Sequence, residues 1–252
     1  MTDRRPAREW DADLYDALST PLTARGIAVL DRVSFRPSDC VLDAGCGTGR
    51  VSAALLERLP AGEVIALDGS AAMVDRARAL VGDDPRVTLV RADLGEPLPL
   101  ASPVDAVVST STFHWVPEHP RLFRNLAAVI RPGGSLHVDC GGEGNIGEVV
   151  EILGDLGESH PWFFSGVAET ETALADAGFR DVRVWLSDDP VAVAPDRLED
   201  YLATVVLGTH LAERSADAGR KLVRRVASRM TVPRFDYVRL NIDARRASAT
   251  TS

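Results

Sequence analysis

Short apolar runs alternate along residues 40–140 with longer stretches that carry apolar residues at helical spacing. The apolar runs predict buried strands at 40–44, 63–68, 87–91, 105–110 and 135–140. The amphipathic stretches between them predict helices at 51–59, 71–81 and 121–130. Near-continuous apolar strands separated by amphipathic helices are typical of a parallel sheet that is covered on both faces. The pattern therefore predicts an α/β fold.

Outside this block the pattern is less regular. Residues 10–33 have helical spacing, and Pro21 is expected to divide them into two helices, because proline is tolerated only in a first helical turn. The later part of the chain predicts helices at 146–156, 169–177, 196–211 and 220–230, and strands at 182–186 and 237–242. The sequence shows no composition break, so we expect one domain over 1–252. Its expected parts are N-terminal lid helices (1–34), a ligand-binding core (35–145), cap helices with the last strands (146–243) and a loose tail (244–252).

The first predicted strand ends in Asp43 and runs into a turn with three alternating glycines, Gly45, Gly47 and Gly49. Glycine lacks a Cβ and tolerates positive φ, so such a turn lets the backbone approach a bound cofactor closely. A strand, a glycine-rich turn and a helix in this order predict a cofactor site at the carboxyl end of the strand.

The turn does not fit a dinucleotide. The dinucleotide fingerprint requires G-x-G-x-x-G, with the pyrophosphate at the helix N-terminus. Counted from Gly45 the third glycine is replaced by Arg50, and counted from Gly47 it is replaced by Ser52. The carboxylate of Asp43 would also face the phosphates, whereas it would attract a ligand with a cationic end. A nucleotide-dependent oxidoreductase is therefore disfavoured.

The Asp-x-Gly-x-Gly-x-Gly pattern resembles motif I of the class I S-adenosylmethionine (SAM) methyltransferases, and three further segments match that family in order. Asp68 ends the second strand, where the family places an acid on the ribose hydroxyls. Asp93 follows the third strand, where the family holds the adenine amino group. Residues 131–138 resemble the family's Pro-Gly-Gly turn and fifth strand. The resemblance covers 35–145 and implies a doubly wound, mostly parallel seven-stranded sheet with an antiparallel last strand, N-terminal helices and a small helical cap.

The resemblance also implies that SAM is the cofactor and that its binding residues come from the ends of the first four strands. These residues are Asp43, Gly45, Cys46, Gly47, Gly49, Asp68, Gly69, Met73, Ala92, Asp93, Leu94 and Ser109.

The acceptor side of the site is expected in residues 109–116, which follow the fourth strand at the switch point where open α/β sheets bind ligands. His114 lies in this segment, and with an ordinary pKa of about 6.5 it could act as a general base. The alternative is that His114 packs beside the cofactor or bonds to the backbone. The aromatic residues of 160–164 either line an apolar pocket or anchor their loop. The segment 109–116 resembles that of the trans-aconitate methyltransferase group, which implies a small-molecule acceptor methylated on a carboxylate or hydroxyl oxygen.

The composition limits the kinds of partner that the protein is expected to bind. The net charge of −9 disfavours nucleic acid, since phosphate binding requires a positive surface. No apolar run approaches the length of about 18 residues that spans a membrane, and no leader is apparent, so a cytoplasmic location is expected. The three cysteines lack metal-ligand spacing, so no metal site is expected. The oligomeric state is left open.

Other functions of the same fold also stay open. The acceptor atom could be nitrogen or carbon in a specialised metabolite. A protein that binds SAM but acts as a regulator or scaffold, without turnover, is a further alternative.

Overall fold

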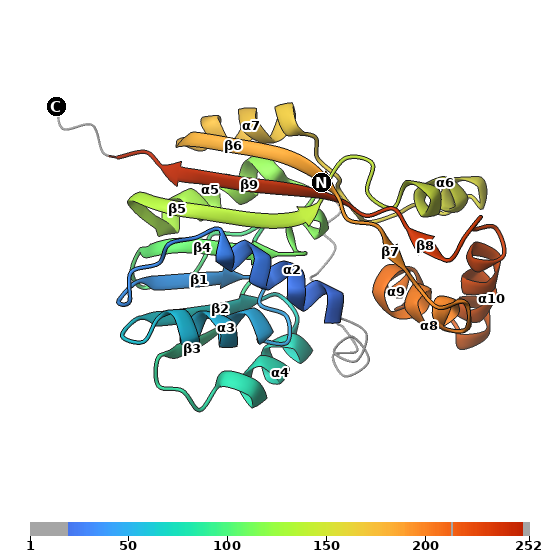
Figure 1. Cartoon of the computed structure of the whole chain (residues 1–252), viewed down its shortest axis with the longest axis horizontal. Helices are drawn as coiled ribbons and strands as arrows, with labels where there is room; N and C mark the ends of the chain where they lie inside the picture. Colours follow the sequence, from blue (N-terminus) through green and yellow to red (C-terminus); the bar gives the residue numbers. More distant parts are fainter. Residues whose placement is uncertain (1–19, 213, 249–252) are drawn as a thin grey trace.

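The computed structural model describes residues 20–212 and 214–248. Its main sheet has seven strands in the order β3-β2-β1-β4-β5-β9-β6 (Figure 1). The strands are β1 (Cys40–Ala44), β2 (Glu63–Asp68), β3 (Val87–Arg91), β4 (Val104–Thr110), β5 (Ile130–Gly141), β6 (Phe179–Asp188) and β9 (Val238–Arg246). Strands β1 to β5 pair in parallel, and β9 is antiparallel to both β5 and β6. The predicted doubly wound, seven-stranded sheet is confirmed.

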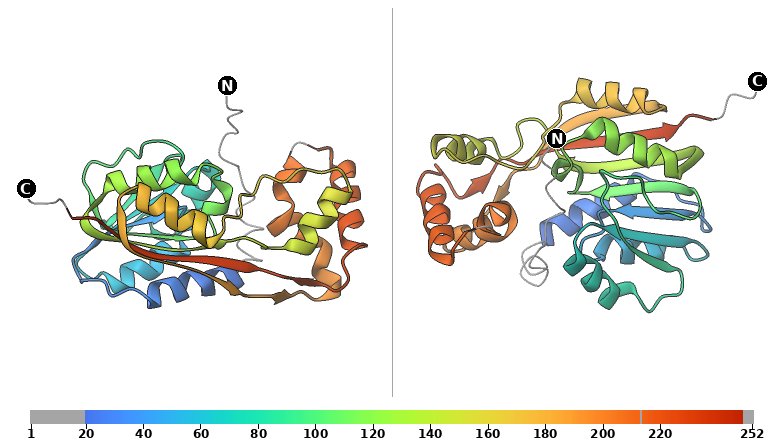
Figure 2. Two further views of the ribbon diagram at one scale, coloured as in Figure 1. Left: turned by 90° about the horizontal axis from the view of Figure 1, so that it is seen from above. Right: turned by 180° about the vertical axis from the view of Figure 1, so that it is seen from behind.

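Helices cover both faces of this sheet, as Figure 2 shows from above. One face carries α2 (Thr20–Asp31), α3 (Arg50–Arg58) and α4 (Ala71–Val81), and the other carries α5 (His119–Val129) and α7 (Val167–Asp176). Alternate side chains of β1 enter different cores: Val41 packs with Leu55 of α3, and Leu42 lies in the cluster that holds Leu126 of α5. Burial on both faces explains why β1 is apolar apart from Asp43.

The sheet order fixes the place of the site. Strand β1 lies between β2 and β4, so the chain winds outward in opposite directions from the β1–β4 pair. A crevice opens at the carboxyl ends of parallel strands at such a switch point. The predicted cofactor residues follow these strand ends.

A cap with its own apolar core lies beside the carboxyl ends of the parallel strands (Figure 1). It consists of α6 (Gly147–Asp155), a 3-10 turn (Pro195–Arg197), α8 (Leu198–Tyr201), a π-helical turn (Leu202–Val206), α9 (Gly208–Ala212) and α10 (Ala216–Ala227), with the short strands β7 (Val191–Ala192) and β8 (Arg234–Phe235). The single helix predicted for 196–211 is therefore wrong: Leu207 N bonds to Leu202 O, which widens the turn, and a new helix begins at Gly208.

The C-terminal end also differs from the prediction. Residues 244–246, expected as the start of a loose tail, belong to β9 and pair on both sides. Ala244 pairs with Leu136 of β5, and Arg246 pairs with Phe179 of β6 and donates to the carbonyls of Ala127 and Gly178. The charged side chains of Arg245 and Arg246 hid the end of a strand that is ordered by its pairing with β5 and β6. Residues 249–252 lie outside the described residues, as does the predicted helix that precedes Pro21.

Among the described residues, no helix combines the length and the apolar character that crossing a membrane would require.

Candidate active site

The turn after β1 is held open by its three glycines. The backbone φ angles of Gly45, Gly47 and Gly49 are 83°, 53° and 86°. Residues that have a Cβ rarely adopt this region. The N–H groups of Gly45 and Cys46 both donate to Leu67 O, at 2.8 and 2.9 Å. These bonds tie the turn to the end of β2, so the turn passes across two neighbouring strand ends.

The surroundings of the first two glycines differ. A Cβ on Gly45 would lie 2.2 Å from Thr112 Oγ1, so the turn packs directly against the loop after β4. A Cβ on Gly47 would meet no described atom within 4 Å. The backbone at Gly47 therefore borders open space, which is where a ligand can lie against it.

Asp43 is buried at the floor of this turn, with 1% of its surface exposed. Its Oδ2 accepts a 2.6 Å hydrogen bond from Ser52 Oγ, whereas its Oδ1 is buried without a hydrogen-bond partner. Burial raises the pKa of Asp43 from 3.8 to about 7; the Ser52 bond opposes this rise and the charge of Asp68 adds to it. An unpaired buried carboxylate oxygen is costly, and a cationic or hydrogen-bonding ligand group would compensate it.

Asp68 links the ends of the first three strands. Its carboxylate accepts bonds from the N–H groups of Gly47 and Ser70, each at 2.9 Å, and its carbonyl accepts one from Ala92 at 3.1 Å. Ser70 also caps α4, accepting from Met73 N at 3.3 Å. These bonds hold the Asp68 carboxylate at the point where the ends of β1, β2 and β3 meet.

The remaining predicted cofactor residues surround this group. Cys46, Met73 and Leu94 are buried apolar side chains, at 6%, 3% and 5% exposure, and Gly69 lies between Asp68 and the α4 cap. Asp93 closes a tight turn by accepting from Gly95 N at 2.8 Å.

Ser109 has a different environment from the rest of the set. It is fully buried, and its hydroxyl donates to Ala44 O at 2.6 Å. The hydroxyl thus joins the ends of β4 and β1, and in this structure it supports the glycine turn rather than facing it.

His114 lies in a 3-10 turn (Phe113–Trp115) and is buried against the end of β5. Its Nδ1 accepts a 3.2 Å hydrogen bond from Gly141 N, so the proton of the neutral ring resides on Nε2. Burial lowers the pKa of His114 well below its usual 6.5, and the charges of Arg239 and His119 act in the same direction. The imidazole is therefore a neutral hydrogen-bond donor at Nε2, which bears on its expected role as a base.

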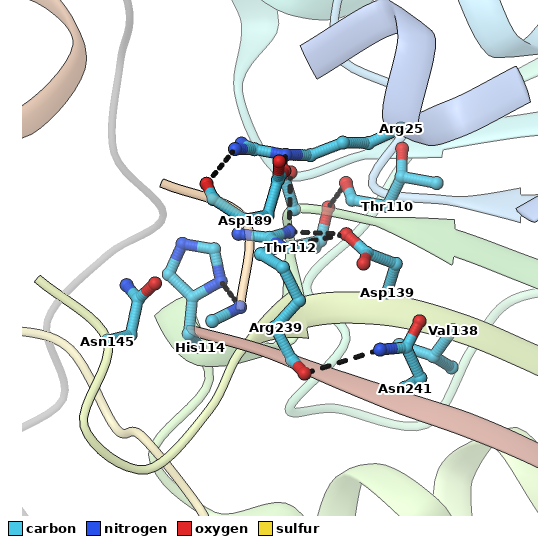
Figure 3. A network of polar contacts seen from close by, with 12 residues as sticks. Arg25, Thr110, Thr112, His114, Val138, Asp139, Asn145, Asp189, Arg239 and Asn241 are labelled. Atoms are coloured by element: carbon cyan, nitrogen blue, oxygen red, sulfur yellow. Dashed lines mark hydrogen bonds and ion pairs between the residues drawn. The ribbon is translucent and has the colours of Figure 1, made fainter. Parts of the chain in front are cut away.

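Beside His114 is a network of charged side chains that sequence reasoning missed (Figure 3). Arg239, in β9, is 3% exposed and pairs with Asp139 of β5, which is 6% exposed, through a 3.0 Å bond from its Nε to Oδ1. Its Nη2 also donates to Ser111 Oγ at 3.0 Å. Ser111 has φ of 54°, a strained value for a residue other than glycine. The network fixes the loop that carries His114.

Helix α2 adds Arg25 to the same region (Figure 3). Arg25 is 8% exposed, forms an ion pair with Asp189 through Nε, and lies with Cζ 4.7 Å from the ring centroid of Tyr237. The hydroxyl groups of Tyr237 and Tyr201 lie 3.0 Å apart. Arg25 falls between Leu22 and Val29 at helical spacing, so an arginine on an otherwise apolar stripe was the sequence signal for it.

Aromatic rings from 160–164 pack against His114 and its neighbour. Phe164 lies 6.0 Å from the His114 ring, and Trp162 lies 6.2 Å from Trp115, between ring centroids. Trp162 also stacks on Phe164 and on His160. The loop is thus anchored to the cap while its rings border the acceptor side of the site. Throughout the described ranges, no group of three or more His, Cys, Asp or Glu side chains is placed to hold a metal ion.

Comparison with known proteins agrees with this geometry. Residues 41–134 match the family model described as a methyltransferase domain. The structure also resembles Haemonchus contortus phosphoethanolamine N-methyltransferase 2 in complex with S-adenosyl-L-methionine, with a TM-score of 0.63 and 20% identity over 94% of this chain and 56% of that one. Residues 41–134 therefore match a methyltransferase domain, and the fold is that of the class I SAM-dependent methyltransferases, a class whose methyl donor is SAM.

Several curated relatives share one name. Trans-aconitate 2-methyltransferase of Acidovorax ebreus is 35% identical over 130 residues, which cover 52% of this chain and 49% of that protein. The enzyme of the same name from Deinococcus radiodurans is 38% identical over 133 residues, covering 51% and 48%. The chain thus matches about half the length of these relatives.

The fold alone does not decide the reaction. The [4+2]-cyclase SpnF also matches, with a TM-score of 0.62 and 19% identity over 98% of this chain and 89% of that one. The acceptor and the reaction must therefore be argued from the site.

Proposed function

We propose that this protein transfers a methyl group from SAM to a carboxylate oxygen of a small organic acid. The observation that carries the cofactor assignment is the unpartnered Oδ1 of buried Asp43 beside the open backbone of Gly47. A cationic or hydrogen-bonding ligand group would compensate that oxygen, and the methionine part of SAM has cationic groups.

The predicted cofactor residues fit this role. The methionine part would lie along Gly47, with its ammonium directed to the Asp43 side of the turn. Asp68 would accept from the ribose hydroxyls while its bonds to the Gly47 and Ser70 N–H groups hold the carboxylate in place. Asp93 would bind the adenine amino group from the end of β3. When bound, SAM supplies a methyl group on a sulfonium, which needs no further activation.

The acceptor side supports a carboxylate. A carboxylate is ionised at neutral pH and needs no general base, so the enzyme has chiefly to align it with the methyl group; such positioning contributes roughly 7–11 kcal/mol. His114 suits this chemistry as a donor, because its Nε2 carries the proton and its Nδ1 is used by Gly141. Taking up a proton would create an imidazolium beside Arg239, which burial and that charge oppose.

The relatives support the same acceptor class, since their name specifies a carboxylic acid, trans-aconitate. Methylation of nitrogen or carbon is the second candidate, because the N-methyltransferase with the same fold shows that this scaffold serves other acceptors.

Two measurements test the proposal. Calorimetry with S-adenosylhomocysteine should give micromolar binding, and NADH in parallel should give none. Protein incubated with methyl-labelled SAM and trans-aconitate should then yield a labelled product that releases methanol in base, as an ester does. Binding without transfer to any acid would favour a regulatory protein, and a base-stable methyl product would favour nitrogen or carbon as the acceptor atom.

A further inference from the structure

Arg25 carries an N–H group that has no hydrogen-bond partner among residues 20–212 and 214–248. Its side chain is buried, its Nε pairs with Asp189, and its Nη2 lies 3.5 Å from the carbonyl of the same residue. Its Nη1 is buried and, among the described residues, has no hydrogen-bond partner. A buried guanidinium nitrogen without an acceptor is costly to a fold, so its retention calls for a ligand.

The tyrosine pair beside Arg25 has a second unused donor. Tyr201 and Tyr237 have their hydroxyl oxygens 3.0 Å apart, so one hydroxyl donates to the other. The second hydroxyl proton has no acceptor among the bonds of the described residues. Both rings are buried, and Arg25 lies over the ring of Tyr237. One cationic N–H group and one O–H group thus lie close together without acceptors.

The charges nearby identify what would fit. Arg239 is matched by Asp139, and both are buried, so that pair is neutral. Asp189 is 47% exposed at its side chain and meets Nε and Nη2 of Arg25, so Nη1 is the nitrogen left without a partner in the part of the chain that the structure describes. A ligand group that fits here accepts hydrogen bonds, donates none, and is favourable beside the positive charge of Arg25. A carboxylate meets all three conditions.

The place of these donors is the acceptor side of the site. A Cβ on Gly26, next to Arg25, would lie 3.6 Å from Thr110 Oγ1 at the end of β4, so this part of α2 lies over the strand that leads into the His114 loop. Figure 3 shows Arg25, Asp189, Arg239 and His114 converging from different elements. The donors therefore lie in the same group of side chains as His114, on the side of the site where an acceptor is expected.

We propose that Arg25, with the Tyr201–Tyr237 pair, forms a subsite that binds a carboxylate of the acceptor and so determines its specificity. The inference rests on the proposed function for the identity of the acceptor, but the subsite itself can be tested by binding alone. Arg25 is a specificity-determining residue in this proposal, and it acts by binding the acceptor.

The test measures binding of trans-aconitate, citrate and the neutral trimethyl ester of trans-aconitate, each with and without S-adenosylhomocysteine. Arg25→Gln should weaken binding of at least one of the two acids about 10- to 100-fold, the loss expected for a hydrogen bond to a charged group. It should leave the ester, which binds weakly to both proteins, and S-adenosylhomocysteine unchanged. Arg25→Lys should recover part of the affinity, because it keeps the charge but loses the planar fork.

Arg32→Gln is the matched control, because Arg32 follows the same helix and also bonds across to β9, at Asn241, but away from this subsite. Its acid affinity should stay within about twofold of wild type. Tyr237→Phe removes a single hydroxyl and provides the same test if Arg25→Gln does not fold; replacing both tyrosines by phenylalanine removes the spare donor whichever ring holds it.

Wild-type affinity for both acids in Arg25→Gln, or no acid binding to wild type, would overturn the subsite. Acid binding that depends on Arg25 without any methyl transfer would instead overturn the proposed function and leave the subsite. Methyl transfer by Arg25→Gln with an unchanged KM for the acid would overturn the subsite and leave the proposed function.

Discussion

Replacing Asp43 by asparagine should make the ligand-free protein more stable at neutral pH while removing its affinity for the cofactor. The wild-type carboxyl has its pKa raised to about 7 by burial, against 3.8 in the unfolded chain. The folded protein therefore binds more protons than the unfolded chain between these values, so its free energy of unfolding falls as pH rises through this window. Asparagine does not titrate, and its Oδ1 can still accept from Ser52.

The magnitude follows from the shift. Each pKa unit corresponds to about 1.4 kcal/mol, so a rise of about three units costs the wild type about 4 kcal/mol above pH 7. Below about pH 4 both states of the wild type are protonated and the cost disappears. The stability difference between Asp43→Asn and wild type should thus grow by about 4 kcal/mol from pH 4 to pH 8.

The assay is urea denaturation of both proteins at several pH values, followed by calorimetry with S-adenosylhomocysteine. Ser52→Ala is the matched control, because loss of the hydroxyl bond should raise the pKa of Asp43 further and move the window to higher pH. In the wild type, a cationic ligand group stabilises the carboxylate, so S-adenosylhomocysteine should bind more tightly from pH 6 to pH 8 and release a proton as it binds.

A stability difference that is independent of pH would refute the reasoning, because Asp43 would then have an ordinary pKa in the fold. Unchanged ligand affinity in Asp43→Asn would separately show that the unpartnered oxygen does not face the ligand.

Three further predictions concern other parts of the site. Gly47→Ala should weaken S-adenosylhomocysteine binding at least tenfold, because its methyl group enters the open space at a positive φ; calorimetry checks this, and full affinity would contradict it. His114→Gln keeps a hydrogen-bond donor and should retain more turnover than His114→Phe, with cofactor affinity unchanged in both. The wild-type rate should show no inflection near pH 6.5. Equal losses of turnover in the two variants would argue against a donor role. Arg239→Met should lower the free energy of unfolding by about 3–5 kcal/mol, because it leaves Asp139 buried and unpaired. Adding Asp139→Leu should recover much of this stability in urea denaturation. An Arg239→Met variant as stable as wild type would show that the ion pair is dispensable.

The sequence predicted the cofactor side of the site because that side is built from local connections. The acids Asp43 and Asp68 lie at the carboxyl ends of buried strands, and the glycine turn comes directly after the first of these strands. Parallel strands bring their carboxyl ends to one edge of the sheet. The periodicity of apolar residues is enough to place such strands, and the turn chemistry limits what can follow them. Seven strands and their helical layers were predicted for the same reason.

Other elements depended on neighbours that local pattern does not reveal. The end of β9 looked like a polar tail, but two flanking strands order it. The segment 196–211 has helical spacing throughout, yet packing in the cap divides it with a π-helical turn. In both places tertiary contacts overrode local pattern.

The acceptor side was decided only by tertiary structure. Arg25 meets Asp189 across 164 residues of sequence, and Arg239 meets Asp139 across 100. Nothing in the residues near either arginine specifies such a partner, since a charge in a helix or strand is by default a solvated side chain. The sequence determined where a cofactor can lie, because that site consists of strand ends and turns. Only the folded chain decided which charges are buried and which donors stay without partners among the described residues, because those contacts join residues far apart in sequence.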